Sequence, residues 1–199
     1  MKLMVIATII VGSTSAVLAD ECHDRFSELL INGSAQEGPL RLHITQEIVG
    51  GKTSLNYHHS DGHNNGMTEM IDPEGDPWSL FIGDNMYAST DKGQSWKLIN
   101  TWDAEKSRND MKAALTKDSA DAKDISCSQE EIDGKPHDVI KGTYTSSMTG
   151  GATIAQTYWV DPLTGWLAKS YSHYQSEHFE TKTTQVVQPA TLMELPNPE

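Results

Sequence analysis

The densest group of side chains that could perform chemistry lies between positions 58 and 63. His58, His59 and His63 occur there together with Asp61. Imidazole nitrogens and carboxylates are ligands that Zn²⁺ and Cu²⁺ accept, so this segment is a candidate metal site. If residues 52–60 form a strand, however, His58 and His59 point to opposite faces of the sheet. The alternative interpretation, which we favour, is a solvated polar hairpin without a metal.

Other signatures of catalysis or ion binding are missing from the sequence. It contains no G-x-S-x-G, no H-E-x-x-H and no phosphate-cradling glycine loop. The acidic residues Asp72, Glu74 and Asp76 do not have the spacing of the twelve-residue calcium loop, so we predict a turn there. We therefore expect a protein that is not an enzyme and that needs no cofactor.

The first nineteen residues have the organisation of an export signal. Lys2 supplies the charged start, residues 3–11 form an apolar run, and Val17-Leu18-Ala19 resembles a cleavage site. The apolar run is too short to span a bilayer, so we expect no stable membrane insertion. The sequence therefore predicts a periplasmic or secreted protein whose mature part, residues 20–199, forms one domain. The formal charge of the full chain, −13, argues against nucleic acid and anionic lipid surfaces as partners.

Two cysteines, Cys22 and Cys127, fall in the predicted mature part. An even number of cysteines in an exported chain predicts a disulfide, because thiols are usually oxidised outside the cytoplasm. A lipid anchor on Cys22 is the rival interpretation. We reject it because Asp20 and Glu21 are acidic where a lipidation signal needs small neutral residues.

The rest of the chain is patterned as strands with two helices. An amphipathic helix is predicted for residues 20–32, with Gly33 as its stop. A second is predicted for residues 103–118, where Ser107 and Asp110 resemble a capping box that could move the start to Ser107. Period-2 alternation predicts about six strands before the second helix and about five after it. These strands cover residues 40–49, 52–60, 67–71, three within 78–102, 125–131, 137–147, 153–160, 166–174 and 179–187, and an extended tail follows at 188–199.

Short connections between the strands predict one antiparallel meander. A sheet of about 11 strands must curl, and two helices are too few to cover both of its faces. We therefore predict a mainly β fold, a curved half-barrel whose concave side is plugged by the helices around an apolar hollow. The strand residues that we predict to line this hollow are Leu42, Ile44, Leu80, Ile82, Trp96 and Leu98.

Two segments carry a resemblance to a known family. Residues 83–87 (Gly-Asp-Asn-Met-Tyr) stand before residues 93–96 (Gly-Gln-Ser-Trp), and residues 158–165 read Tyr-Trp-Val-Asp-Pro-Leu-Thr-Gly. With the order of elements, these resemble the LolA/LolB lipoprotein-carrier superfamily, which includes the sensor part of RseB and mycobacterial lipid-binding lipoproteins. The resemblance implies an exported carrier or sensor that sequesters an acyl chain or another apolar ligand. The lipoprotein carriers have a basic residue near the third strand, whereas residues 67–72 here read M-T-E-M-I-D, so the resemblance implies binding of apolar ligands rather than lipoprotein trafficking.

Two other functions stay open at this point. One is a metal-binding periplasmic module that uses His58, His59 and His63. The other is an envelope protein-interaction domain, in which a sheet edge or the tail pairs with a partner protein.

Overall fold

A computed structural model describes residues 14–33, 38–63, 65–190 and 194–198. The predicted export signal lies largely outside this range, and its last residues, from Thr14, continue the first helix. Within the described residues, no helix is long and apolar enough to cross a membrane.

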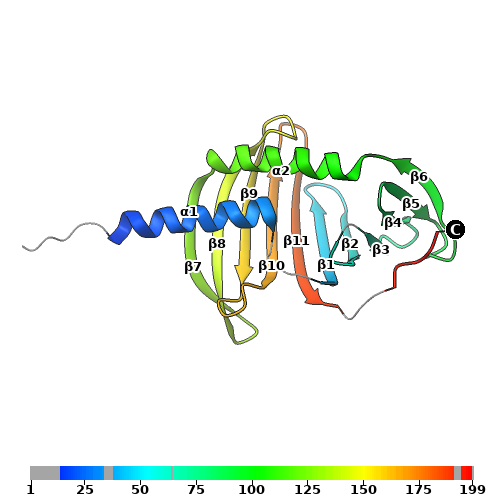
Figure 1. Ribbon diagram of the computed structural model, residues 1–199, viewed down its shortest axis with the longest axis horizontal. Helices are drawn as coiled ribbons and strands as arrows, with labels where there is room; N and C mark the ends of the chain where they lie inside the picture. The colour runs from blue at the N-terminus through cyan, green and yellow to red at the C-terminus, as the bar shows by residue number, and fades with distance from the viewer. Residues whose placement is uncertain (1–13, 34–37, 64, 191–193, 199) are drawn as a thin grey trace, which may run out of the picture.

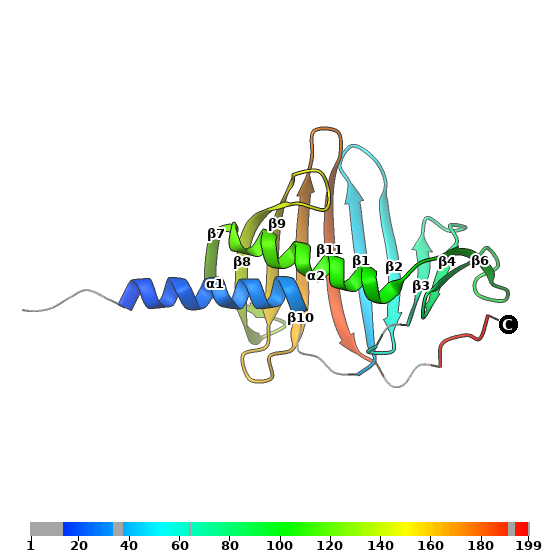
Figure 2. The ribbon, with the colours of Figure 1, turned by 45° about the horizontal axis from the view of Figure 1, so that its top comes forward.

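Eleven strands form one antiparallel sheet, as predicted, with the order β6-β5-β4-β3-β2-β1-β11-β10-β9-β8-β7. Its two edge strands, β6 and β7, do not pair with each other, so the sheet is an open half-barrel (Figure 1). The strands are β1 (Leu40–Ile48), β2 (Thr53–Ser60), β3 (Gly66–Asp72), β4 (Trp78–Ile82), β5 (Asn85–Ser89), β6 (Lys97–Thr101), β7 (Lys123–Ile132), β8 (Lys135–Ser146), β9 (Ala152–Val160), β10 (Leu167–Gln175) and β11 (Glu180–Pro189). The predicted tail therefore begins within β11, and its end lies beside β6 (Figures 1 and 2).

Two helices lie on one face of this sheet, which we call the inner face (Figures 1 and 2). Helix α1 (Thr14–Asn32) ends where Gly33, at a φ of 67°, donates its N–H to the Leu29 carbonyl at 3.0 Å. The predicted disulfide between Cys22 and Cys127 is present and ties α1 to the edge strand β7.

Helix α2 (Ala104–Ala120) begins three residues earlier than the capping-box alternative predicted. Its N-cap is Asp103, whose carboxylate accepts a hydrogen bond from the Lys106 N–H at 2.8 Å. This bond satisfies one of the free N–H groups of the first turn, so a start at Ser107 is wrong.

The hydrophobic core lies under α1, at one end of the sheet. Phe26 is fully buried, and its ring lies 6.1 Å from that of Tyr158 on β9. The ring also lies directly on the backbone of Gly142, where an added Cβ would come within 2.7 Å of it. The other buried members of this cluster are Leu30, Ile140, Tyr144 and Val160.

The strand pairing identifies which residues lie on the inner face, because directly paired residues share a face. From the core residue Ile140, the cross-strand partners lead to Tyr158, Ser170, Gln185, Ile44 and Asn56 in turn. The main contacts of both helices with the sheet are, however, with β7 and β8. The inner face of the β1–β4 part therefore lacks the close helical cover that the β7–β9 part has.

Candidate functional site

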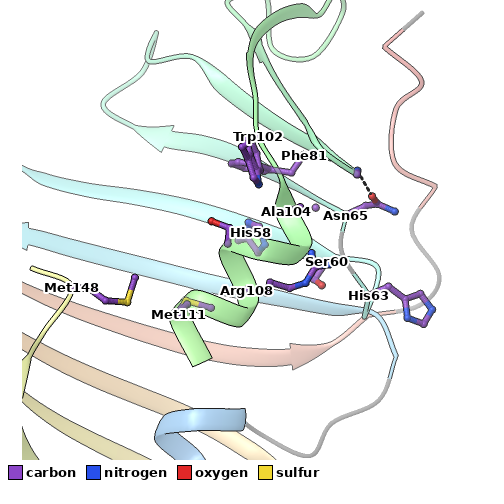
Figure 3. A pocket seen from close by; sticks show the side chains of 13 residues that line it. His58, Ser60, His63, Asn65, Phe81, Trp102, Ala104, Arg108, Met111 and Met148 are labelled. Carbon is purple, nitrogen blue, oxygen red and sulfur yellow. Dashed lines mark hydrogen bonds between the residues drawn. The ribbon is translucent and has the colours of Figure 1, made fainter. Parts of the chain in front are cut away.

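A pocket of about 760 Å³ lies between the first turns of α2 and strands β2 to β4 (Figure 3). Its large apolar side chains come from β4, from α2 and its approach, and from the β8–β9 turn. Polar side chains of β2 and the β2–β3 loop lie opposite α2. The lining residues are His58, Ser60, His63, Asn65, Gly66, Phe81, Gly83, Trp102, Ala104, Ser107, Arg108, Met111 and Met148.

Strand register brings the strand residues of the pocket together. Ser60 is paired with Gly66, and Gly66 is paired with Phe81, so the three share the inner face. Gly66 is needed there because a Cβ at this position would come within 2.8 Å of the His59 carbonyl oxygen and within 2.9 Å of the His58 ring. The missing side chain lets the His58 imidazole lie over β3, where its Nδ1 is 3.0 Å from the Thr68 hydroxyl.

The β4–β5 turn fixes the start of α2 beside these strands. The carbonyl of Asp84 accepts a hydrogen bond from the Trp102 N–H at 3.0 Å, and its carboxylate accepts one from the Ala104 N–H at 3.1 Å. The Trp102 ring meets the Phe81 ring edge to face at 5.9 Å. These contacts hold the apolar wall of the pocket in place.

A second set of hydrogen bonds joins the β2–β3 loop to the same turn. The Asn65 side-chain oxygen accepts a hydrogen bond from the Gly83 N–H at 2.9 Å (Figure 3). The Asn65 amide in turn donates to the Asp61 carboxylate at 2.7 Å. Partial burial raises the pKa of Asp61, but hydrogen bonds from the backbone of His63 and from Asn65 together outweigh it and lower the pKa below its ordinary value. Asp61 is therefore a structural group that orders the loop.

The electrostatics of the pocket are dominated by one cation. No Asp or Glu occurs among the described residues that line it, and Arg108 is its one side chain with a permanent charge. His58 contributes little positive charge at neutral pH, because burial, and to a smaller extent the neighbouring His59, lower its pKa. The pocket is therefore an apolar groove with a guanidinium at its side.

Two apolar side chains of the pocket are also open to solvent. Met111 on α2 is 45% exposed, and Met148 in the β8–β9 turn is 56% exposed. Methionine is flexible and polarisable, so such side chains adapt to ligands of different shape. The arrangement can bury an apolar group against Phe81 and Trp102 and cover it with the two methionines.

The six residues predicted to line a hollow are divided between the two faces of the sheet. Leu42 and Ile44 lie on the inner face, where Leu42 is the cross-strand partner of His58. Leu80 is paired with Met67 and lies on the outer face, fully buried, and alternation places Ile82 on the same face. None of the six lines the pocket of Figure 3.

The last two of these residues lie near the β6 edge. Leu98 is paired with Tyr87, on the same outer face as Leu80, and is 51% exposed. Trp96 precedes β6 and packs with Trp78 around Gly93, where an added Cβ would lie 3.2 to 3.5 Å from their rings.

The three candidate metal ligands do not converge. His58 faces the pocket, whereas His59 lies on the outer face with its Nε2 3.5 Å from the Glu69 carboxylate. His63 is in the exposed β2–β3 loop, and its side chain points away from His58 (Figure 3). Over the described parts of the chain, no group of three or more His, Cys, Asp or Glu side chains could hold a metal ion. The predicted turn at residues 72–76 is present, and Glu74 there accepts a hydrogen bond from the Lys92 ammonium at 2.8 Å.

Comparisons with known proteins found similar folds but no family assignment. No protein-family model matches the chain, and no curated protein matches it. A LolA superfamily protein from Nitrosomonas europaea is 10% identical, with a TM-score of 0.35, and the match covers 90% of this chain and 95% of that one. The chain resembles the LolA/LolB-like superfamily in layout, as the sequence predicted.

Two further solved structures match the chain. A chain of the Pseudomonas aeruginosa MucA/MucB complex is 14% identical, with a TM-score of 0.42 and coverage of 86% of this chain and 58% of that one. A putative outer membrane lipoprotein-sorting protein domain from Vibrio parahaemolyticus is 13% identical, with a TM-score of 0.35 and coverage of 89% and 93%. At these values the likeness concerns the fold alone.

Several residues of the pocket were not expected from the sequence. Neither Phe81 nor Met111 is among the six residues that the sequence analysis predicts to line the hollow, yet both line the pocket. The positions 104, 107, 108 and 111 do follow the i, i+3, i+4, i+7 spacing of one helix face. That spacing could have placed Arg108 beside Met111, but Ser107 and Arg108 obscure the stripe because they are polar.

Proposed function

We propose that the protein is an exported, soluble carrier or sensor that buries an apolar or amphiphilic ligand, such as an acyl chain, in the pocket between α2 and strands β2 to β4. The observation that carries this proposal is the pocket itself, which is walled by Phe81 and Trp102 and flanked by exposed methionines. Its volume of about 760 Å³ lies within the range of roughly 300–1,000 Å³ that is usual for small-molecule sites.

The exposed apolar residues Met111 and Met148 are better explained by ligand binding than by a contribution to stability. Met111 and Met148 lie on different elements, yet both border the same groove. Exposed apolar surface that gathers at a concave site is typical of ligand-binding grooves. A ligand that removes these side chains from water gains roughly 25 cal/mol for each Å² of apolar surface buried.

Export is supported by the sequence and by the disulfide. Residues 1–19 have the pattern of a signal segment. The bond between Cys22 and Cys127 is of the kind that persists in oxidising compartments such as the periplasm. The site residues include no arrangement to which we assign a catalytic step.

The test is the binding of a neutral fluorescent probe, N-phenyl-1-naphthylamine, to the chain and to a variant with a filled pocket. Ser107→Trp places an indole in the groove without removing one of its apolar walls, and we expect it to weaken probe binding at least about tenfold. Ala113→Trp is the matched control, because Ala113 is exposed on the same helix and does not line the pocket. We expect this control to bind as the unmodified chain does.

Two results would contradict the proposal. One is an unmodified chain that does not bind the probe at any concentration at which the probe is soluble. The other is a Ser107→Trp variant that binds it with unchanged affinity, because the ligand would then occupy a different part of the molecule.

A further inference from the structure

The three arginines of the chain differ in how they are paired. Arg25 donates to the Asp138 carboxylate at 2.8 Å. Arg41 donates to the Gln188 side chain at 2.8 Å, and its guanidinium lies 4.6 Å from the centre of the Tyr57 ring. The Arg108 side chain has no hydrogen bond, ion pair or ring contact with any of the described residues, and Arg108 is the one arginine that lines the pocket.

The charge around Arg108 is unusual for this chain. The chain as a whole has 28 acidic and 15 basic residues, so an acidic neighbour is the expected surrounding of a surface cation. The described lining of the pocket nevertheless includes no carboxylate. An anion that enters the groove therefore meets a guanidinium without competition from an internal partner.

The neighbours of Arg108 complete a site with two different ends. Ser107 precedes it, and Ser60 lies across the groove on β2 (Figure 3). The apolar residues Phe81 and Trp102 lie toward the start of α2, where Ala104 is buried. One end of a ligand would thus meet N–H and O–H donors, and the other would meet aromatic rings.

We propose that the ligand is a single-chain amphiphile with a carboxylate head, of the fatty-acid type, and that Arg108 binds the carboxylate. This inference rests on the proposed function and specifies the class of ligand. A guanidinium presents parallel N–H donors that match the two oxygens of a carboxylate. The cavity volume is that of a site for a drug-sized molecule, which favours one chain over a lipid with two. Because Arg108 is exposed at the side of the groove, the head stays near water while the chain is buried.

The test compares ligands that differ only in the head group. Dodecanoate, dodecanol, dodecyl phosphate and dodecyltrimethylammonium are titrated against the mature chain by displacement of N-phenyl-1-naphthylamine, below their micelle concentrations. We expect dodecanoate to bind at least about tenfold more tightly than dodecanol, since hydrogen bonds to charged groups are the stronger ones. We expect dodecyltrimethylammonium to bind more weakly than dodecanol.

Variants of α2 assign the difference to Arg108. Arg108→Gln should bind dodecanoate and dodecanol with equal affinity, because the guanidinium that distinguishes the two head groups is absent. Lys112→Gln is the charge-matched control, because Lys112 is exposed on the same helix and does not line the pocket. This control should keep the preference for dodecanoate. Raising the salt concentration should weaken dodecanoate binding and leave dodecanol binding unaffected.

The outcomes separate this inference from the proposed function. If dodecanoate and dodecanol bind equally to the unmodified chain, the inference is wrong and the proposed function stands. If Arg108→Gln loses affinity for both, Arg108 supports the fold of the groove and does not read the head group. Tighter binding of dodecyl phosphate than of dodecanoate would overturn the carboxylate assignment. If no ligand and no probe binds, the proposed function itself fails.

Discussion

The two ends of the inner face are built from the same sheet but are filled differently. At the β7–β9 end, Phe26 of α1 lies against the backbone of Gly142, with no room between them. At the β2–β4 end, α2 presents Ala104 and Ser107, whose side chains are short, and a pocket of about 760 Å³ lies between helix and sheet. The large aromatic residue of α1 thus fills the space over the sheet at the first end. The short side chains of α2 leave a groove at the second.

The pKa shifts of titratable groups differ between the two ends as well. At the filled end, burial, together with the nearby Asp118 charge, raises the pKa of Tyr144 to about 12. Burial also raises the pKa of Tyr158, the ring that packs on Phe26. At the groove, His58 is half-buried beside Thr68 and its pKa is lowered, while Arg108 on the opposite wall is exposed. The first region keeps its buried tyrosines protonated, and the second brings an apolar wall and a solvated cation close together.

The largest effect should come from replacing one aromatic residue at each end by alanine. Phe26→Ala should lower the free energy of unfolding by about 3–5 kcal/mol, because it removes a fully buried ring and leaves a cavity. Phe81→Ala should cost less stability, because Phe81 is only half-buried, but should weaken binding of the neutral probe. Urea unfolding and probe titration measure the two quantities. The Phe26→Ala variant should still bind the probe without urea, provided that it is folded. If the folded variant does not bind the probe, the two ends are coupled.

A smaller effect should come from adding one methyl group at the filled end. Gly142→Ala should destabilise the protein by about 1–3 kcal/mol, since the new Cβ would lie 2.7 Å from the Phe26 ring. Phe26→Leu should reduce the cost of Gly142→Ala in the double variant, because the smaller side chain leaves room for the methyl group. Thermal unfolding of the four proteins gives the coupling. Additive effects would mean that Phe26 does not pack on Gly142.

The smallest effect should be a pH dependence from the groove. The pKa of His58 lies below its ordinary value of 6.5 in the folded protein, so the unfolded chain binds a proton first as the pH falls. Stability from His58 is therefore complete above pH 6.5 and is lost as the pH falls through its lowered pKa. Urea unfolding at a series of pH values should show a smaller acid loss for His58→Gln than for the unmodified chain. His178→Gln is the control, because the His178 side chain is 86% exposed, and its pH profile should match that of the unmodified chain.

The layout of the protein could be predicted from local patterns, but the location of the pocket could not. Alternation and turn residues predicted the strands, and an even cysteine count predicted the disulfide between Cys22 and Cys127. A single meander does not include the pairing of β1 with β11, which joins segments far apart in the sequence. The β4 segment is apolar on both faces, so alternation alone does not indicate which face meets the helices. The pairing of Gly66 with Phe81 decides this, and it turns Leu80 and Ile82 outward.

The start of α2 was uncertain for a similar reason. Both Asp103 and Ser107 are residue types that cap helices. The Asp84 turn, which is distant in sequence, binds the Ala104 N–H and makes the earlier start favourable. The groove depends on this tertiary contact, because a later start would remove Ala104 from its wall.

The covalent link between Cys22 and Cys127 makes the two walls of the half-barrel unequal in stiffness. It fastens α1 to the outermost strand of the filled end, so that side has a fixed width. The groove side is bordered by the unbranched side chains of Met111 and Met148, which can change rotamer at little cost. Under the proposed function, ligands of different size would therefore be accommodated by movement of the methionine side of the groove. The end that the disulfide ties would keep its position.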